Sequence, residues 1–282
     1  MRYHNGPFSL QNDGQLWIYF LGCGSAFSKK QNQTNYLIVK GTDHVLVDCG
    51  TTCSRALIDA GLSILDIDNV IVSHSHADHV GGLEELMLMN RYVARKKPRI
   101  YIPASYQRML WNQSLRGGAE NNERHDGSGL AFDDYWEVTR PKTVYDRTRD
   151  AQEITIGEIT IRTFRTRHYP EQATDWRNAA YSIGLVVDER VVISGDTQFD
   201  PDMLHEVEPH GGAETIFFDA QFFTGGIHAS LEELKSLPDN KRSITYLVHY
   251  GDNYESKTEE VQASGFAGFA HQHTIYEFDT HL

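Results

Sequence analysis

The sequence of 282 residues predicts an α/β fold, with mixed β-sheets covered by helices and two sheets within one domain. Three observations predict this class. Short apolar runs rich in β-branched residues recur along the chain, as strands do. Segments with helical periodicity separate some of these runs, whereas tight turns join others. Parallel and antiparallel strands should therefore occur together.

The expected strands are short, and two pairs of them read as hairpins. The hairpin tips are expected within Thr155–Thr160 and Val187–Val191, where polar turn residues separate apolar runs. The expected strands, in chain order, are Leu16–Leu21, Tyr36–Val39, His44–Val47, Val70–Val72, Ile100–Ile102, Ile154–Ile156, Ile159–Phe164, Tyr181–Val187, Val191–Ile193, Ile216–Phe218, Ile244–Val248 and Thr274–Phe278.

Helices are expected where apolar residues recur at helical spacing beside capping signals. Gly61 is a plausible C-terminal cap, Asp200 a plausible N-cap before a proline, and the Ser-Leu-Glu-Glu string from Ser230 reads as a capping box. The expected helices are Cys53–Ala60, Ala77–Ala94, Pro201–Val207, Ser230–Leu237 and one within 257–270.

The segment at about 111–135 differs from the rest of the chain. It is rich in Gly, Asn, Asp, Glu and Arg, so we expect an insertion or a mobile loop within a single domain of residues 1–282. Such a segment suits a lid, a partner surface or a plain surface excursion.

Composition indicates a cytoplasmic globular protein. The mean hydropathy is −0.47, the longest apolar run is too short to span a bilayer, and the N-terminus lacks the pattern of a signal peptide. The three cysteines, Cys23, Cys49 and Cys53, form an odd and sparse set, so we expect buried thiols rather than disulfides. No membrane partner is expected.

The formal net charge of −13 disfavours long nucleic acid as a partner, because proteins that grip a polyanion usually present a strong basic face. Basic residues gather only within Arg91–Arg99 and Arg162–Arg167, and either group reads as an ordinary solvated face. The balance favours a small anionic ligand.

The strongest chemical signal is the string His74-Ser75-His76-Ala77-Asp78-His79, directly after an apolar run. Histidine is the commonest metal ligand, and carboxylate suits hard or borderline divalent ions. If a strand precedes the string, His74 and His76 leave the sheet on one side of the chain. If a helix begins near Ala77, Asp78 and His79 point elsewhere. The string therefore predicts ligands for two neighbouring ions.

Several apolar runs end in a residue that could bind a metal. In helix-covered sheets, sites gather beyond the carboxyl ends of the strands, so these residues are expected to converge on one edge. The residues are Asp48, His74, His168, Asp196, Asp219 and His249.

This pattern resembles the metallo-β-lactamase superfamily of dinuclear metal hydrolases. The five motifs of that superfamily occur in order at Asp48, His74–His79, His168, Asp196 and His249. The similarity runs from Phe20-Leu21-Gly22-Cys23-Gly24-Ser25-Ala26 to Val248-His249-Tyr250-Gly251. The resemblance implies a four-layer αββα sandwich that holds two divalent ions.

The resemblance also implies roles for individual residues. Asp48 is expected behind the ligands, accepting a hydrogen bond from a ligand imidazole, and Asp219 is expected in a similar supporting position. The implied ligands are His74, His76 and His168 for the first ion, Asp78, His79 and His249 for the second, and Asp196 as a bridge between the two.

The branch is indicated by further residues. Aspartate at position 196 is typical of members that cleave phosphodiesters, lactones or thioesters. The strings Phe218–Gln221 and Gly226–Ser230 are similar to a motif of the ribonuclease Z-like branch, whose histidine protonates a leaving oxygen; His228 matches it. The gap from Tyr169 to Gly195 has no room for the basic arm of tRNA-processing members.

The arm is absent, and the chain resembles arm-less cyclic-nucleotide phosphodiesterases, including phage enzymes of the anti-Pycsar type. The strings that carry this resemblance are Leu110-Trp111, Leu115–Gly118 and Asp134–Trp136. We therefore expect hydrolysis of a phosphodiester in a small or cyclic nucleotide by a metal-bridging hydroxide. Asp78 would orient or deprotonate the attacking water, and His228 would protonate the leaving oxygen.

Other assignments are weaker expectations. Arg167, Tyr169 and Ser25 are candidate substrate contacts. Zinc is the default ion for an imidazole-rich site, and manganese or iron would fit the same ligands. The alternatives are a ribonuclease Z-type RNA endonuclease, a lactone or thioester hydrolase, and a metal-stabilised binding module without activity. By analogy with arm-less relatives, the chain is expected to form a homodimer.

Overall fold

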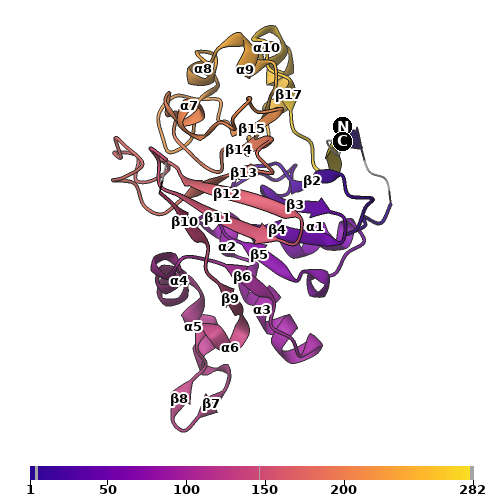
Figure 1. Ribbon diagram of the computed structural model, residues 1–282, viewed down its shortest axis with the longest axis vertical. Helices are drawn as coiled ribbons and strands as arrows, with labels where there is room; N and C mark the ends of the chain where they lie inside the picture. Colours follow the sequence, from indigo (N-terminus) through magenta and orange to yellow (C-terminus); the bar gives the residue numbers. More distant parts are fainter. Residues whose placement is uncertain (4–5, 146, 280–282) are drawn as a thin grey trace. The chain divides into compact units, whose positions relative to one another are not determined.

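The structure is a computed structural model that describes residues 1–3, 6–145 and 147–279 (Figure 1). The chain forms two compact units, each built on one eight-stranded sheet. Unit 1 comprises Met1–Gly22, Asn32–Pro141 and His273–Leu282, and unit 2 comprises Cys23–Gln31 and Lys142–Gln272. The predicted mixture of two sheets with helices is confirmed.

The sheet of unit 1 is antiparallel at one side and parallel at the other. Strands β4, β5, β6 and β9 run parallel, so the carboxyl ends of β4 and β5 lie at the same edge. In spatial order the strands are β1 (Arg2–Tyr3), β18 (Thr274–Phe278), β2 (Leu16–Gly22), β3 (Asn35–Lys40), β4 (Asp43–Val47), β5 (Asn69–Ile71), β6 (Arg99–Tyr101) and β9 (Glu137–Thr139).

The helices of unit 1 begin with α1 (Cys53–Asp59), which packs against β2, and the short η1 (Ile64–Asp66). The helix expected over Ala77–Ala94 is divided into α2 (Ala77–Val80), α3 (Leu83–Met89) and the π-helical η2 (Asn90–Ala94). The division falls at Gly81 and Gly82. A Cβ on Gly82 would lie 2.6 Å from the Gly50 carbonyl oxygen, so the chain approaches the 49–51 turn too closely for a side chain.

The polar segment 111–135 is largely helical rather than a structureless loop. It contains buried apolar residues such as Leu115, Phe132 and Tyr135. The hairpin β7–β8 extends beyond α5 and α6 at the tip of this region (Figure 1). Its elements, with the preceding helix, are α4 (Ala104–Leu110), η3 (Trp111–Leu115), α5 (Arg116–Ala119), η4 (Glu120–Asn122), β7 (Arg124–His125), β8 (Ser128–Gly129) and α6 (Phe132–Tyr135).

The sheet of unit 2 is antiparallel from β10 to β14 and parallel from β14 to β17. Both predicted hairpins are confirmed, since Ile156 pairs with Ile159 and Val187 with Val191. In spatial order the strands are β10 (Lys142–Val144), β11 (Ala151–Ile156), β12 (Ile159–Arg165), β13 (Ile183–Val187), β14 (Val191–Ile193), β15 (Thr215–Asp219), β16 (Thr245–Val248) and β17 (Gly268–Phe269).

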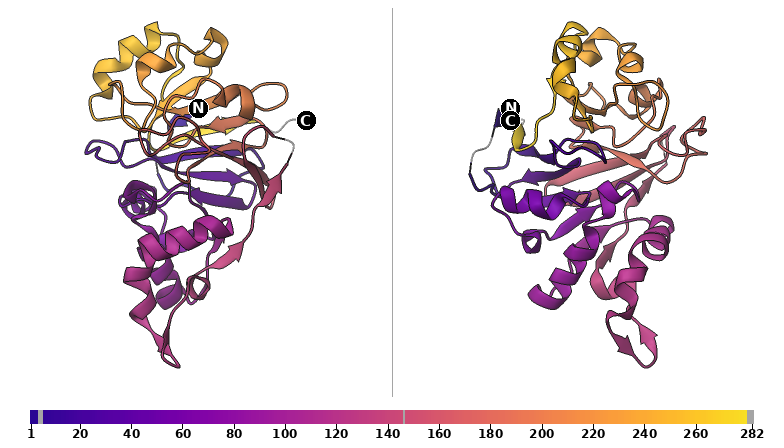
Figure 2. Two further views of the ribbon diagram at one scale, coloured as in Figure 1. Left: turned by 90° about the vertical axis from the view of Figure 1, so that its left-hand side faces the viewer. Right: turned by 180° about the vertical axis from the view of Figure 1, so that it is seen from behind.

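The helices of unit 2 are shorter than predicted. The N-cap of α7 (Met203–Val207) is Asp202 rather than Asp200, and the last helix, α10 (Thr258–Ala263), stops before Gly265, whose φ is +82°. The capping box at Ser230 is confirmed, and it opens α8 (Leu231–Leu234). Figure 2 shows α8, α9 (Asp239–Arg242) and α10 gathered in one part of this unit; η5 (Tyr254–Lys257) precedes α10.

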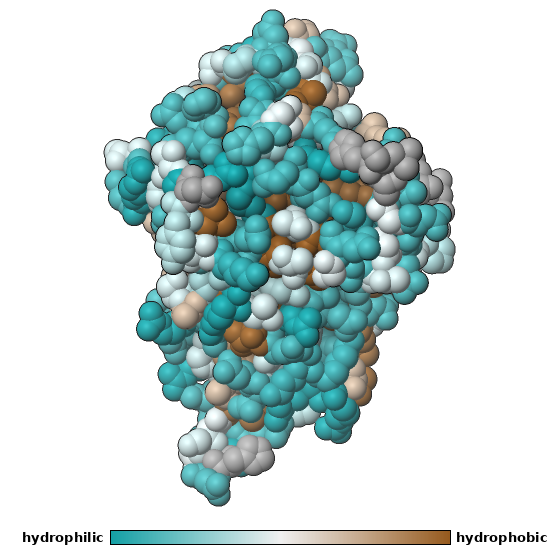
Figure 3. All heavy atoms as spheres, in the orientation of Figure 1, coloured by the Kyte–Doolittle hydropathy of each residue, from teal (hydrophilic) through white to brown (hydrophobic). Residues whose placement is uncertain are grey.

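The core consists of the predicted apolar runs. The three cysteines are buried free thiols, as expected. The face of the molecule in Figure 3 is mostly hydrophilic, with only small apolar areas. Among the described residues, no helix has the length and apolar character needed to cross a membrane.

Candidate metal centre

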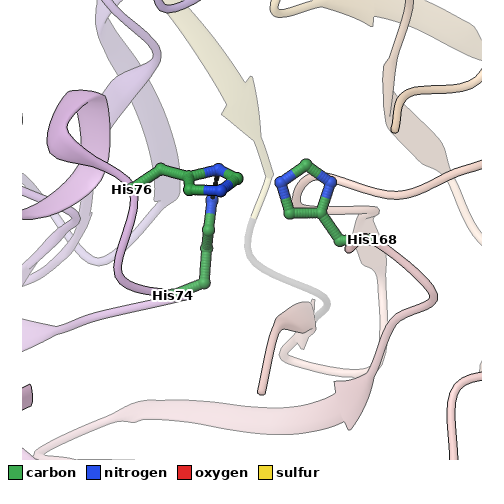
Figure 4. Close-up of side chains that lie close together, drawn as sticks. All are labelled: His74, His76 and His168. Atoms are coloured by element: carbon green, nitrogen blue, oxygen red, sulfur yellow. Dashed lines mark hydrogen bonds between the residues drawn. The ribbon is translucent and has the colours of Figure 1, made fainter. Parts of the chain in front are cut away.

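Unit 1 holds a group of imidazoles just beyond the carboxyl end of β5. The segment from Ser73 leaves the sheet and enters α2, and this turn carries the predicted histidine string. His74 Nε2 and His76 Nδ1 approach each other to 2.9 Å (Figure 4). Both rings therefore present a nitrogen to the same small volume, as two ligands of one ion would.

Asp48 lies at the end of β4 and holds this turn. Its Oδ1 accepts a hydrogen bond from the Ser73 amide at 2.7 Å, and its Oδ2 lies 2.6 Å from both the Ser73 hydroxyl and His79 Nδ1. An ionised carboxylate can only accept, so His79 Nδ1 donates. In the neutral ring Nε2 then carries the lone pair, and it lies 3.2 Å from Asp78 Oδ2. Ser73 is a supporting residue that the sequence reasoning missed, although its position between strand and histidine could have indicated it.

Unit 2 brings its candidate ligands to one edge of its sheet. Strands β14, β15 and β16 are parallel neighbours, so Asp196, Asp219 and His249 emerge together. His168 follows β12, which points the same way because two antiparallel pairings separate it from β14. Asp48 and His74 follow strands of the unit 1 sheet, and the other four candidate residues follow strands of the unit 2 sheet.

Two of these residues have left-handed backbones directly after their strands. Asp48 has φ of 64° and His249 has φ of 60°. This conformation is uncommon outside glycine and costs of order 1–3 kcal/mol, so it persists where surrounding structure holds it and is common at functional sites. In both cases the strained residue turns the chain at the edge that carries the candidate ligands.

The Asp196 carboxylate has three imidazoles around it. Its Oδ2 lies 3.3 Å from His249 Nε2, 3.8 Å from His168 Nε2 and 3.9 Å from His228 Nδ1. Potential ligand atoms of His168, Asp196 and His228 all lie within 4.8 Å of one another. Apart from His228, which is partly exposed, these side chains are buried. A buried carboxylate surrounded by imidazole nitrogens is a donor set that suits a divalent cation.

The ring orientations in unit 2 also suit metal binding. His168 Nδ1 donates to the Ile227 carbonyl at 2.8 Å, which leaves Nε2 as the lone-pair atom. Burial lowers the pKa of His168 to about 4, so the ring is neutral near pH 7, as a ligand must be. His249 Nδ1 lies 3.4 Å from Asp219 Oδ1, and its Nε2 faces Asp196. The residues therefore fit a metal site.

Asp219 has a second contact that the sequence did not predict. Its Oδ2 lies 2.7 Å from His228 Nδ1 and also accepts from the Thr197 amide at 2.9 Å. Burial by itself raises the pKa of Asp219, but the attraction of His228 and the hydrogen bonds outweigh it, and the net pKa is lowered. The Asp219 carboxylate therefore fixes the orientation of the His228 ring through Nδ1, as a proton donor requires.

The candidate substrate contacts have different surroundings. Arg167 donates to the Phe199 carbonyl, and the Tyr169 ring meets the His168 ring edge-on with centroids 5.1 Å apart. Ser25, by contrast, lines a pocket of about 520 Å³ in unit 2 together with His228 and His249. Arg167 and Tyr169 are not among the described residues that line this pocket.

The family of the chain follows from comparison with known proteins. The sequence model described as "Anti-Pycsar protein Apyc1" matches residues 16–276. The chain belongs to the Apyc1 family. An Apyc1 protein of Bacillus phage BSP38 is 35% identical over 244 residues, which is 84% of this chain and 90% of the relative. Apyc1 of Paenibacillus sp. (strain J14) is 33% identical over 262 residues, which is 93% of this chain and 98% of the relative.

Solved structures support the fold assignment. The metallo-β-lactamase fold protein YhfI from Bacillus subtilis superposes with a TM-score of 0.69 at 16% identity, covering 93% of this chain and 99% of YhfI. The short form of human tRNase Z gives a TM-score of 0.63 at 17% identity, covering 94% and 100% of the two chains. The predicted metallo-β-lactamase fold is confirmed. The chain is therefore an Apyc1-family protein with the metallo-β-lactamase fold.

Proposed function

We propose that this chain is a divalent-metal-dependent phosphodiesterase that hydrolyses small cyclic nucleotides. One observation carries the proposal. The Asp196 carboxylate, faced by imidazoles of His168 and His249, adjoins a carboxylate-oriented histidine, His228, at the wall of a ligand-sized pocket. Metal ligands and a proton donor beside one pocket are the parts that phosphodiester hydrolysis needs. Membership in the Apyc1 family supports the same reaction class.

The proposed site binds two divalent ions. Zinc is the default ion, with manganese or iron as substitutes. When bound, two divalent ions lower the pKa of a water molecule and neutralise charge on the phosphoryl oxygens. The proposed ligands are His74, His76 and His168 for one ion, Asp78, His79 and His249 for the other, and Asp196 shared between them.

The chain's own residues would move the protons. The attacking water gives a proton to Asp78 as its oxygen bonds to phosphorus. The bond from phosphorus to the leaving sugar oxygen breaks in the same displacement, and His228 Nε2 gives that oxygen a proton. Asp219 keeps Nδ1 of His228 hydrogen-bonded and so holds the ring in position for that transfer. Such a general acid contributes roughly 10²–10⁴-fold to the rate.

The charge of the pocket favours a substrate with a single phosphate. No lysine or arginine is among the described residues that line the pocket beside His228 and His249. A chain of net charge −13 without a basic groove there is a poor match for a long polyanion. We also propose that the chain is a single domain, forms a homodimer and is located in the cytoplasm, as predicted from the sequence.

The test is a substrate panel with purified, metal-analysed protein. We expect hydrolysis of 3′,5′-cyclic mononucleotides, loss of activity with a chelator and recovery on adding Zn²⁺ or Mn²⁺. Faster cleavage of a structured RNA or an acyl lactone would overturn the substrate class in favour of a ribonuclease Z-type or lactone-hydrolase activity. No turnover of any substrate, including bis(nitrophenyl) phosphate, with any divalent ion would favour a binding module.

A further inference from the structure

Two exposed phenylalanines line the pocket that His228 and His249 share in unit 2. Phe27 is 86% exposed and Phe223 is 66% exposed, yet both belong to the lining of this one pocket of about 520 Å³. Single exposed apolar side chains are ordinary on protein surfaces. Two large aromatic rings at the same pocket, beside a candidate phosphate-cleaving site, indicate a ligand with an apolar face.

The loop that carries Phe27 is held firmly. The Asp252 carboxylate accepts hydrogen bonds from the Ser28 hydroxyl at 2.5 Å, the Lys29 amide at 2.9 Å and the Lys30 amide at 3.0 Å. These bonds lower the pKa of Asp252 and keep it charged. Phe27 is thus presented to solvent by a loop of fixed shape, which reduces the entropy cost of binding a ligand.

The loop that carries Phe223 is held by different groups. The Gln221 side-chain amide donates to the Phe223 carbonyl at 2.9 Å, and the Gly226 amide donates to Glu171 Oε1 at 2.8 Å. Phe222 packs edge-on against Phe269, with ring centroids 5.9 Å apart. Both exposed rings therefore stand on loops that internal contacts position independently of any ligand.

The remaining groups of the pocket define the chemistry of its occupant. Ser25 and Asn253 also line the pocket, and neither side chain makes a hydrogen bond to another described residue. The pocket thus offers aromatic faces and uncharged hydrogen-bonding groups, and neither lysine nor arginine is among its described lining residues. A planar heterocycle with a polar edge and no charge matches this set.

We propose that Phe27 and Phe223 are the nucleobase-binding residues of this protein, stacking on the base of a nucleoside cyclic monophosphate while Ser25 and Asn253 meet its polar edge. This inference rests on the proposed phosphodiesterase function. Stacking is tolerant of base identity because every base has a π-face. The pocket should therefore accept purines and pyrimidines and discriminate chiefly against substrates that have no base.

The test compares Phe27→Ala and Phe223→Ala with wild type on 3′,5′-cyclic nucleotides and on 1-deoxyribose 3′,5′-cyclic phosphate, which lacks a base. Each variant should raise KM for the cyclic nucleotides roughly 5- to 100-fold, and the preference of kcat/KM for the base-bearing substrate should fall. Tyr145→Ala is the matched control, because Tyr145 is a 91% exposed aromatic residue of the same unit outside the pocket lining.

An unchanged preference for the base in both variants would overturn the inference while leaving the phosphodiesterase function intact. If wild type cleaves no cyclic nucleotide, the proposed function fails, and calorimetric titration of a nucleoside 5′-monophosphate then tests the pocket alone: weaker binding to the alanine variants supports base binding, and equal binding refutes it. Where an alanine variant fails to fold, Phe→Leu at the same position keeps the apolar volume and removes the ring.

Discussion

Replacing Asp219 by asparagine tests the proposed proton-donor arrangement directly. Asp219 Oδ2 lies 2.7 Å from His228 Nδ1, and Oδ1 lies 3.4 Å from His249 Nδ1. Asparagine has nearly the same shape, but it is uncharged and offers only one acceptor oxygen. Asp219→Asn should therefore keep the shape of the site but replace the charged hydrogen bond that orients His228 with a weaker one.

The size of the effect follows from the hydrogen bond that is weakened. A hydrogen bond to a charged group contributes roughly 1.5–3 kcal/mol. At about 1.4 kcal/mol per factor of ten, its loss should lower kcat for a cyclic nucleotide roughly 10- to 150-fold. The loss cannot exceed the whole general-acid contribution, roughly 10²–10⁴-fold, which His228→Ala should approach.

The assay compares leaving groups. A ribose oxygen needs a proton as it departs, whereas nitrophenolate leaves without one. The loss in Asp219→Asn should be large with a cyclic nucleotide and small with a nitrophenyl phosphodiester. Metal content is measured in parallel, because Asp219 also contacts His249. The matched control is Asp239→Asn, since the Asp239 side chain is 96% exposed and is not among the residues that line the pocket beside His228.

Equal losses with both leaving groups, at unchanged metal content, would refute the proton-donor role of His228 and the orienting role of Asp219. So would full activity of Asp219→Asn with the cyclic nucleotide. A loss that follows the metal content instead would assign Asp219 to the support of His249 alone.

Three further predictions concern ligands, stability and pH. Asp196→Ala should abolish turnover and lower bound metal with an unchanged circular-dichroism spectrum; an active variant would contradict its role as a ligand. Arg149 is 2% exposed and pairs with Asp200 at 2.7 Å and Glu206 at 2.6 Å. Arg149→Leu should therefore lower the free energy of unfolding, measured by urea titration, by about 3–5 kcal/mol. A loss under about 1 kcal/mol would be inconsistent with a buried ion network. Burial lowers the pKa of His44 in the folded protein, so the unfolded chain takes up a proton at higher pH than the folded chain does, and the free energy of unfolding should fall as pH drops below about 6.5. His44→Gln should flatten this decline between pH 7 and 5. Parallel curves of unfolding free energy against pH for the two proteins would contradict the assignment.

Local patterns predicted the strands and hairpins well because each depends on neighbouring residues. The turns near Gly157 and Asp188 separate apolar runs that pair as expected. The helix over 77–94 and the segment 111–135 were predicted less well. Helical periodicity continues through Gly81 and Gly82, and only the approach of the 49–51 turn explains the division there. In 111–135 the polar composition concealed a small set of buried apolar residues.

The sequence by itself determined which residues could bind metal and that they follow directly from strands, because chain order and strand ends are local properties. Only the tertiary structure decided which carboxylate supports which imidazole. Asp219 meets His228 and His249, and Asp48 meets His79, across separations of nine to about thirty residues along the chain. The meeting of Phe27 and Phe223 in one pocket spans still more of the chain. Such contacts depend on the order of strands in the sheet and on how loops pack, and no local pattern specifies either.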